Sequence, residues 1–101
     1  MKLKKGIKIK GISNEMILGL NVIETILKSM DNSKELVITS LLEGNHMKGS
    51  YHYKGEAADV RTRNWNEEFI NNFVLLLNKE IGEWFDIVKE NTHIHIEYDE
   101  R

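Results

Sequence analysis

Two segments of the chain carry apolar side chains at the spacing of an α-helix, which restricts the chain to folds that contain two amphipathic helices. In the first segment, Ser13 or Asn14 can cap a helix that ends at the turn-forming residues 31–33. In the second segment, Asn66 precedes the apolar stripe and Gly82 closes it. The two stripes consist of Met16, Leu20, Ile23, Leu27 and Met30, and of Phe69 or Ile70, Phe73, Leu77 and Ile81.

The segments around these helices have the composition of short β-strands. Some alternate apolar and polar residues, and others are rich in β-branched side chains. Helices and strands are interspersed along the chain, which favours the α+β class. We therefore predict a single domain over residues 1–101, with two helices and a small, mostly antiparallel sheet. The expected strands are residues 7–10, 35–40, 56–61, 84–89 and 92–98.

The composition argues against several classes of function. The net charge of −2 over 101 residues gives no general attraction to nucleic acid or to an anionic membrane. The chain has no cysteine, so any metal must be bound by His, Asp or Glu. No apolar run approaches the roughly 20 residues of a membrane span, and the N-terminus lacks the apolar segment of a signal peptide. We expect a monomer that is made in the cytoplasm without an export signal and that binds neither nucleic acid nor membrane.

Histidine and carboxylate side chains gather in two short stretches. The first is "SYHYKGEAAD", in which His52 and Asp59 are separated by Gly55. Glycine allows the chain to bend between two ligands of one metal ion. This stretch therefore supplies two candidate metal ligands.

The second stretch is "THIHIEYD" at the end of the chain. In a strand the side chains alternate, so the two isoleucines face the core and His93, His95 and Glu97 share the opposite face. Catalytic zinc takes three protein ligands of the nitrogen or oxygen type and keeps one position open. His52, Asp59 and one histidine of the pair would complete such a set.

The first stretch also carries a signature. Ser50, His52, Gly55, Ala57 and Asp59 fit, position by position, the pattern SxHxxGxAxD. With the HxH pair that follows, the chain resembles the zinc D-alanyl-D-alanine carboxypeptidases and L-alanyl-D-glutamate endolysins, the LAS metallopeptidases. Their fold is shared with the hedgehog signalling domain. The chain from residue 37 onward looks like small versions of this domain from bacteriophages, which implies release to the cell wall or carriage in a virion.

The resemblance implies hydrolysis of a peptide bond in the stem peptide of bacterial peptidoglycan. Zn²⁺ would be bound by His52, Asp59 and His95, with Glu90 as the base that takes a proton from zinc-activated water and His93 acting beside the metal. An ExxH reading, from Glu90 to His93, would make His93 the ligand instead. The HxH form of the family usually coordinates through its second histidine, which favours His95. The bond cleaved, and carboxypeptidase or endopeptidase action, stay open.

One departure from the family concerns substrate binding. Many relatives carry an arginine just after the strand that ends in "TS", whereas this chain continues with leucine. His46, Lys48 and Arg61 are within reach to replace this cation, and of these we expect His46 and Arg61 to contact the substrate. Ser50 is expected beside them as a hydrogen-bond partner. The missing arginine also keeps an alternative open, a noncatalytic hedgehog-like zinc domain whose surface binds a protein partner.

Overall fold

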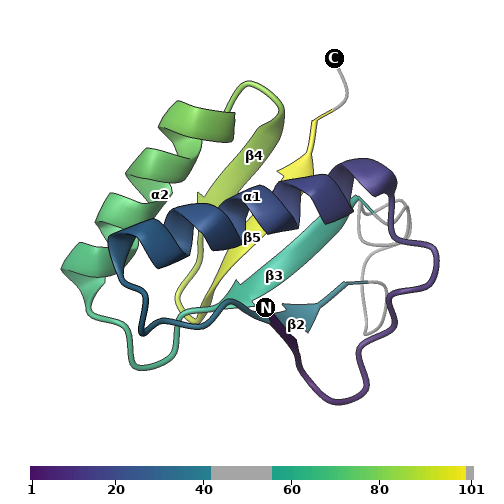
Figure 1. The fold of residues 1–101 in the computed structure, drawn as a ribbon, viewed down its shortest axis with the longest axis horizontal. Helices are drawn as coiled ribbons and strands as arrows, with labels where there is room; N and C mark the ends of the chain where they lie inside the picture. Colours follow the sequence, from purple (N-terminus) through teal and green to yellow (C-terminus); the bar gives the residue numbers. More distant parts are fainter. Residues whose placement is uncertain (42–55, 100–101) are drawn as a thin grey trace.

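A computed structural model describes residues 1–41 and 56–99, which fold into two helices and one five-stranded sheet (Figure 1). The predicted α+β class and the mostly antiparallel sheet are confirmed. In chain order the elements are β1 (Lys2–Leu3), α1 (Asn14–Met30), β2 (Val37–Ser40), β3 (Ala57–Arg61), α2 (Glu67–Ile81), β4 (Phe85–Lys89) and β5 (His93–Tyr98).

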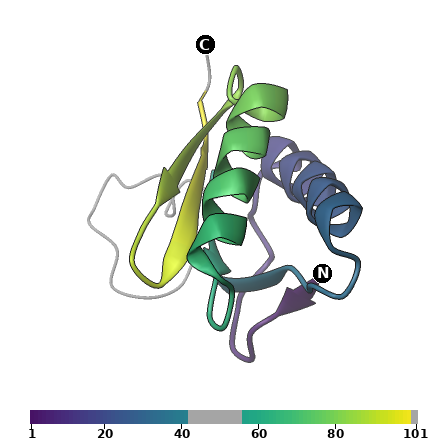
Figure 2. The same cartoon turned by 90° about the vertical axis from the view of Figure 1, so that its left-hand side faces the viewer.

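The strands lie in the order β1-β2-β3-β5-β4. β1 runs parallel to β2, and the other neighbouring strands are antiparallel. The central pair is β3 and β5, which stay in register from Ala57 opposite Glu97 to Arg61 opposite His93. Both helices lie on the same side of the sheet (Figure 2). Within the described residues no helix covers the other side, which we call the open face.

Both helices begin where the sequence predicts. The side chain of Ser13 accepts a hydrogen bond of 3.1 Å from the backbone N–H of Met16, and Asn66 Oδ1 accepts one of 3.0 Å from Phe69. Each cap satisfies an N–H group that has no partner inside its helix. Helix α1 ends at Met30, before the predicted turn, and α2 ends before Gly82.

The core lies between the helices and the sheet. Ile94 and Ile96 of β5 are fully buried, as predicted from the alternation in this strand. A Cβ at Gly19 of α1 would overlap the ring of Phe85, so α1 can approach the start of β4 only because residue 19 has no side chain. The helices contribute the buried residues Met16, Leu20, Ile23, Ile26, Leu27, Ile70, Phe73, Leu77 and Ile81.

The predicted strand at residues 7–10 is wrong. Gly6 and Gly11 adopt positive φ angles of 93° and 97°, which turn the chain at both ends of this short segment. Ile9 is 54% exposed, so the alternating isoleucines do not face the core together. The first strand is β1 instead, where Lys2 N–H donates to the carbonyl of Leu36 at 2.8 Å and pairs the chain with β2. Alternation over four residues was insufficient, because a strand also needs a neighbouring strand with free backbone groups.

Among the described residues, neither helix combines the length and the apolar character that crossing a lipid bilayer requires.

Candidate metal centre

The register of the sheet arranges the polar side chains of the open face in rows across three strands. Asp59 of β3 lies opposite His95 of β5, and His95 lies opposite Val88 of β4. The next row pairs Arg61 with His93. Cross-strand partners share a face of the sheet, so these side chains all stand on the side away from the helices. Residues of the two motifs thus meet on one surface, although Asp59 and His95 lie 36 residues apart in the chain.

His95 lies between two carboxylates. Its Nδ1 is 2.8 Å from Oδ1 of Asp59, and its Nε2 is 2.7 Å from Oε1 of Glu97. The three side chains are partly buried, with exposed fractions of 21% for His95, 17% for Asp59 and 27% for Glu97. Both ring nitrogens therefore donate to a carboxylate, and the ring orientation is fixed at both ends.

This arrangement raises the pKa of His95 from 6.5 to about 9. The main cause is the hydrogen bond with Asp59, and the hydrogen bond with Glu97 acts in the same direction. Burial opposes both, because it disfavours the charged imidazolium. With this pKa, His95 is an imidazolium between two carboxylates at neutral pH.

A dependence of stability on pH follows from this pKa. The folded-state pKa of His95, about 9, lies above the unfolded value of 6.5, so its contribution to stability is complete below pH 6.5 and is lost as the pH rises through 9. The full shift corresponds to about 3 kcal/mol, and contact with solvent reduces the expected loss to about 1–2 kcal/mol. Denaturant unfolding of chelator-treated protein at pH 6.5 and 9.5 measures it. The His95→Gln variant is the control, and an equal loss in that variant would assign the effect to other groups.

His93 stands beside this pair but makes a looser contact. Its Nε2 is 3.8 Å from Oδ1 of Asp59, which is too long for a direct hydrogen bond. Its Nδ1 is 3.0 Å from the hydroxyl of Thr92, and the side chain is 32% exposed. The carboxylate of Asp59 therefore has both histidines of the HxH pair as neighbours, with His95 in direct contact and His93 more accessible to a ligand.

Glu90 lies at the turn between β4 and β5. Its backbone N–H donates to the carbonyl of His93 at 2.8 Å, which continues the pairing of the two strands by one residue. Lys89 pairs with Ile94, so Glu90, the residue after Lys89, stands opposite His93. Glu90 therefore lies on the open face. The side chain of Glu90 is exposed. The structure thus brings Glu90 to the row of His93 and Arg61.

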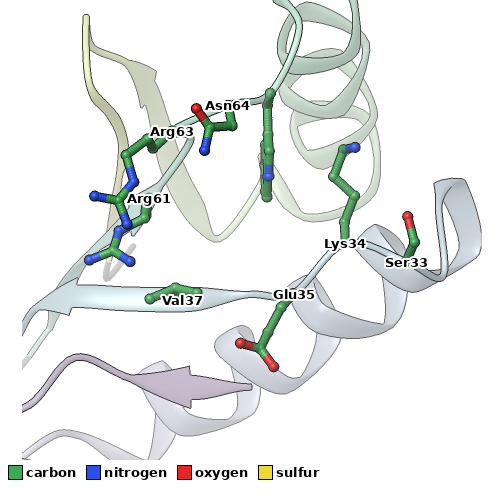
Figure 3. Close-up of a pocket in the computed structure, with 8 residues that line it drawn as sticks. Ser33, Lys34, Glu35, Val37, Arg61, Arg63 and Asn64 are labelled. Atoms are coloured by element: carbon green, nitrogen blue, oxygen red, sulfur yellow. The ribbon is translucent and has the colours of Figure 1, made fainter.

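Arg61 and Arg63 line a cavity next to His93. The cavity has a volume of about 340 Å³ and is bordered also by three threonines, residues 39, 62 and 92. Both arginines also line a second pocket, which Figure 3 shows. In this view the two guanidinium groups lie on the same side of the chain at the end of β3. In the part of the chain that the structure describes, neither guanidinium is ion-paired with Asp or Glu. Two such cations near one cavity create a positive potential that favours an anion.

Three of the predicted site residues, His46, Ser50 and His52, lie outside the described residues. Within residues 1–41 and 56–99, no group of three or more His, Asp or Glu side chains is arranged to hold a metal ion. The described part supplies Asp59 and His95 as candidate ligands, with one oxygen and one nitrogen donor in direct contact. This donor set fits zinc, which takes imidazole nitrogen and carboxylate oxygen.

Three neighbours of the site were not predicted as partners of its residues. Glu97 was placed on the correct face, but its contact with His95 was not foreseen, although a spacing of two residues on a strand allowed it. Thr92 has no signal in the sequence beyond its position before His93. Arg63 was not among the predicted substrate contacts, and its place two residues after Arg61 was the available signal.

The comparisons with known proteins add no family to this description: no family model matches the chain, and no curated protein matches it. The resemblance therefore stays a prediction that rests on the motif residues.

Proposed function

We propose that this protein is a zinc-dependent peptidase of the hedgehog-type fold that hydrolyses a peptide bond in the stem peptide of bacterial peptidoglycan. The observation that carries the proposal is the contact of 2.8 Å between Asp59, from the first motif, and His95, from the second. Two independent motifs that fold onto one point are expected of a metal site and are not required by the core, since these side chains face away from it. His52 is the proposed third ligand.

Zinc, when bound, supplies a Lewis acid that polarises the scissile carbonyl and makes water acidic enough to attack at neutral pH. The chain's own residues handle the protons and charges. The exposed carboxylate of Glu90 accepts the proton of the attacking water and returns it to the leaving amine. His93 donates from Nε2 to the carbonyl oxygen as negative charge develops there. Asp59 orients the imidazole of His95 through their contact of 2.8 Å.

The cavity beside His93 indicates the chemistry of the substrate. Arg61 and Arg63 border it together with threonine hydroxyls, which suits the two oxygens of a carboxylate. We therefore propose that the peptide substrate carries a free carboxylate close to the bond cleaved, and that Arg61 replaces the arginine that many relatives have after the "TS" strand. The proposed place of action is the bacterial cell wall, because that is where the substrate occurs. We propose that this protein is encoded by a phage.

Replacing Arg61 by glutamine is expected to raise KM for a carboxylate-bearing peptide by about 10-fold or more, with kcat much less affected. Hydrogen bonds between charged groups contribute about 1.5–3 kcal/mol, and this one would act in substrate binding. Steady-state kinetics with the free acid and with the C-terminal amide of the same peptide measure the effect. Lys79→Gln, the same loss of charge in the last turn of α2, is the matched control. Equal KM values for Arg61→Gln and the wild type would remove Arg61 from the substrate site.

The proposed activity is tested by the release of new amino groups from purified peptidoglycan. Zinc-loaded protein should release them, and protein kept in chelator should not. The Asp59→Asn variant should be inactive under both conditions. If the wild type holds zinc and releases nothing from peptidoglycan or from stem peptides, the peptidase proposal is wrong and the noncatalytic zinc domain replaces it.

That second candidate has an observation of its own. Leu18 and Trp84 are 67% and 52% exposed and border an apolar cavity of about 350 Å³ between α1 and the start of β4. Large exposed apolar side chains around a cavity are typical of protein interaction surfaces. A zinc domain without catalytic activity would use such a surface to bind a protein partner.

A further inference from the structure

We propose that Glu97 is a positioning residue of the zinc site, which holds the ring of His95 so that Nδ1, and not Nε2, is presented to the metal. This inference rests on the proposed function, because it assigns a role toward the proposed zinc ion. It concerns a residue that neither motif contains.

The contacts of His95 carry the argument. Glu97 Oε1 is 2.7 Å from Nε2 of His95, and this contact occupies the ring nitrogen that points away from Asp59. The other nitrogen, Nδ1, lies 2.8 Å from Asp59 Oδ1 and therefore on the side of the proposed ligands. A neutral imidazole has one donor and one acceptor nitrogen. A carboxylate that accepts from Nε2–H leaves the lone pair on Nδ1, the nitrogen beside Asp59.

The backbone makes this contact specific. Residues 95 and 97 lie in the same strand, β5, and their side chains stand on the same face. Glu97 is directly opposite Ala57 of β3 and Asp86 of β4. The small side chain of Ala57 leaves room for the side chain of Glu97 to lie along β5 toward His95. Metal-bound histidines commonly donate their second N–H to a carboxylate, which fixes the ring and strengthens the ligand.

Loss of such a partner typically weakens metal binding by about 10- to 100-fold. We therefore expect Glu97→Ala to lower the zinc affinity by that factor, as measured by competition with a chromophoric chelator. Glu97→Gln keeps an oxygen acceptor and should recover part of the loss. In long-range ¹H–¹⁵N spectra of the zinc-loaded wild type, the proton of the His95 ring should be on Nε2. In Glu97→Ala, this preference should weaken.

Asp86→Ala is the matched control. It removes one carboxylate from the same face, directly across from Glu97, without a contact to His95. An equal loss of zinc affinity in Asp86→Ala and Glu97→Ala would mean that general charge, and not positioning, is responsible, and would overturn the role. Unchanged affinity in Glu97→Ala, with zinc bound normally by the wild type, would overturn it as well. A wild type that binds no zinc would instead overturn the proposed metal site, and with it this role.

Discussion

Replacing His95 by alanine is expected to abolish stoichiometric zinc binding, whereas replacing His93 by alanine should leave about one zinc ion per chain and remove the activity. The difference follows from the contacts with Asp59. Nδ1 of His95 is 2.8 Å from Oδ1 of Asp59, and Nε2 of His93 is 3.8 Å from the same oxygen. A site with three protein ligands cannot lose one without a large loss of affinity. Elemental analysis after dialysis, and titration with zinc, measure the content.

The two variants control each other, since each removes one imidazole from the same strand and the same face. Thermal unfolding gives an independent measurement, because a ligand that binds only the folded state raises its stability. Zinc should therefore raise the melting temperature of the wild type and of His93→Ala, but not that of His95→Ala. Circular dichroism of the chelated proteins checks that each variant is folded. If His93→Ala loses the metal and His95→Ala retains it, the ExxH interpretation with His93 as ligand replaces ours.

The parts of the fold that were predicted correctly depend on short-range rules. The caps at Ser13 and Asn66 and the burial of Ile94 and Ile96 follow from local periodicity and from side chains that bond to their own backbone. A strand, by contrast, forms only against a partner. The isoleucine alternation at residues 7–10 therefore gave a wrong prediction, while β1 formed beside β2 on two residues without a distinct pattern.

In the candidate site, too, some features follow from local rules and others depend on contacts between strands. Alternation alone placed His93, His95 and Glu97 on one face, as the structure has them. The pairing of His95 with Asp59 depends on the register of β3 against β5, and a shift of one residue would have put the two on opposite faces. The choice of Glu97 as the partner of Nε2 depends on a side-chain rotamer, and the cavity at Arg61 depends on how strands and loops meet. Neither can be read from spacing.

Replacing Glu90 by glutamine is expected to lower the turnover number by on the order of 10²-fold or more, without a loss of zinc. The substitution preserves the size of the side chain but removes the basic oxygen that a proton acceptor needs. Glu90 stands opposite His93 at the end of the β4–β5 pair, through the 2.8 Å backbone hydrogen bond, and its side chain is exposed and free to reach a substrate. It is not in contact with the proposed ligand pair of Asp59 and His95, so metal binding should not depend on it.

The test compares kcat, KM and zinc content of Glu90→Gln with those of Glu83→Gln. Glu83 is an exposed glutamate just before the opposite end of β4, so the same chemical change there should leave all three values as in the wild type. The pH profile separates the role further, because loss of a general base removes the limb of kcat/KM that reports its ionisation. An unchanged turnover in Glu90→Gln would transfer the role of base to His93 or Glu97, which stand on the same face. A parallel loss of zinc would mean that Glu90 binds the metal and does not act on the water.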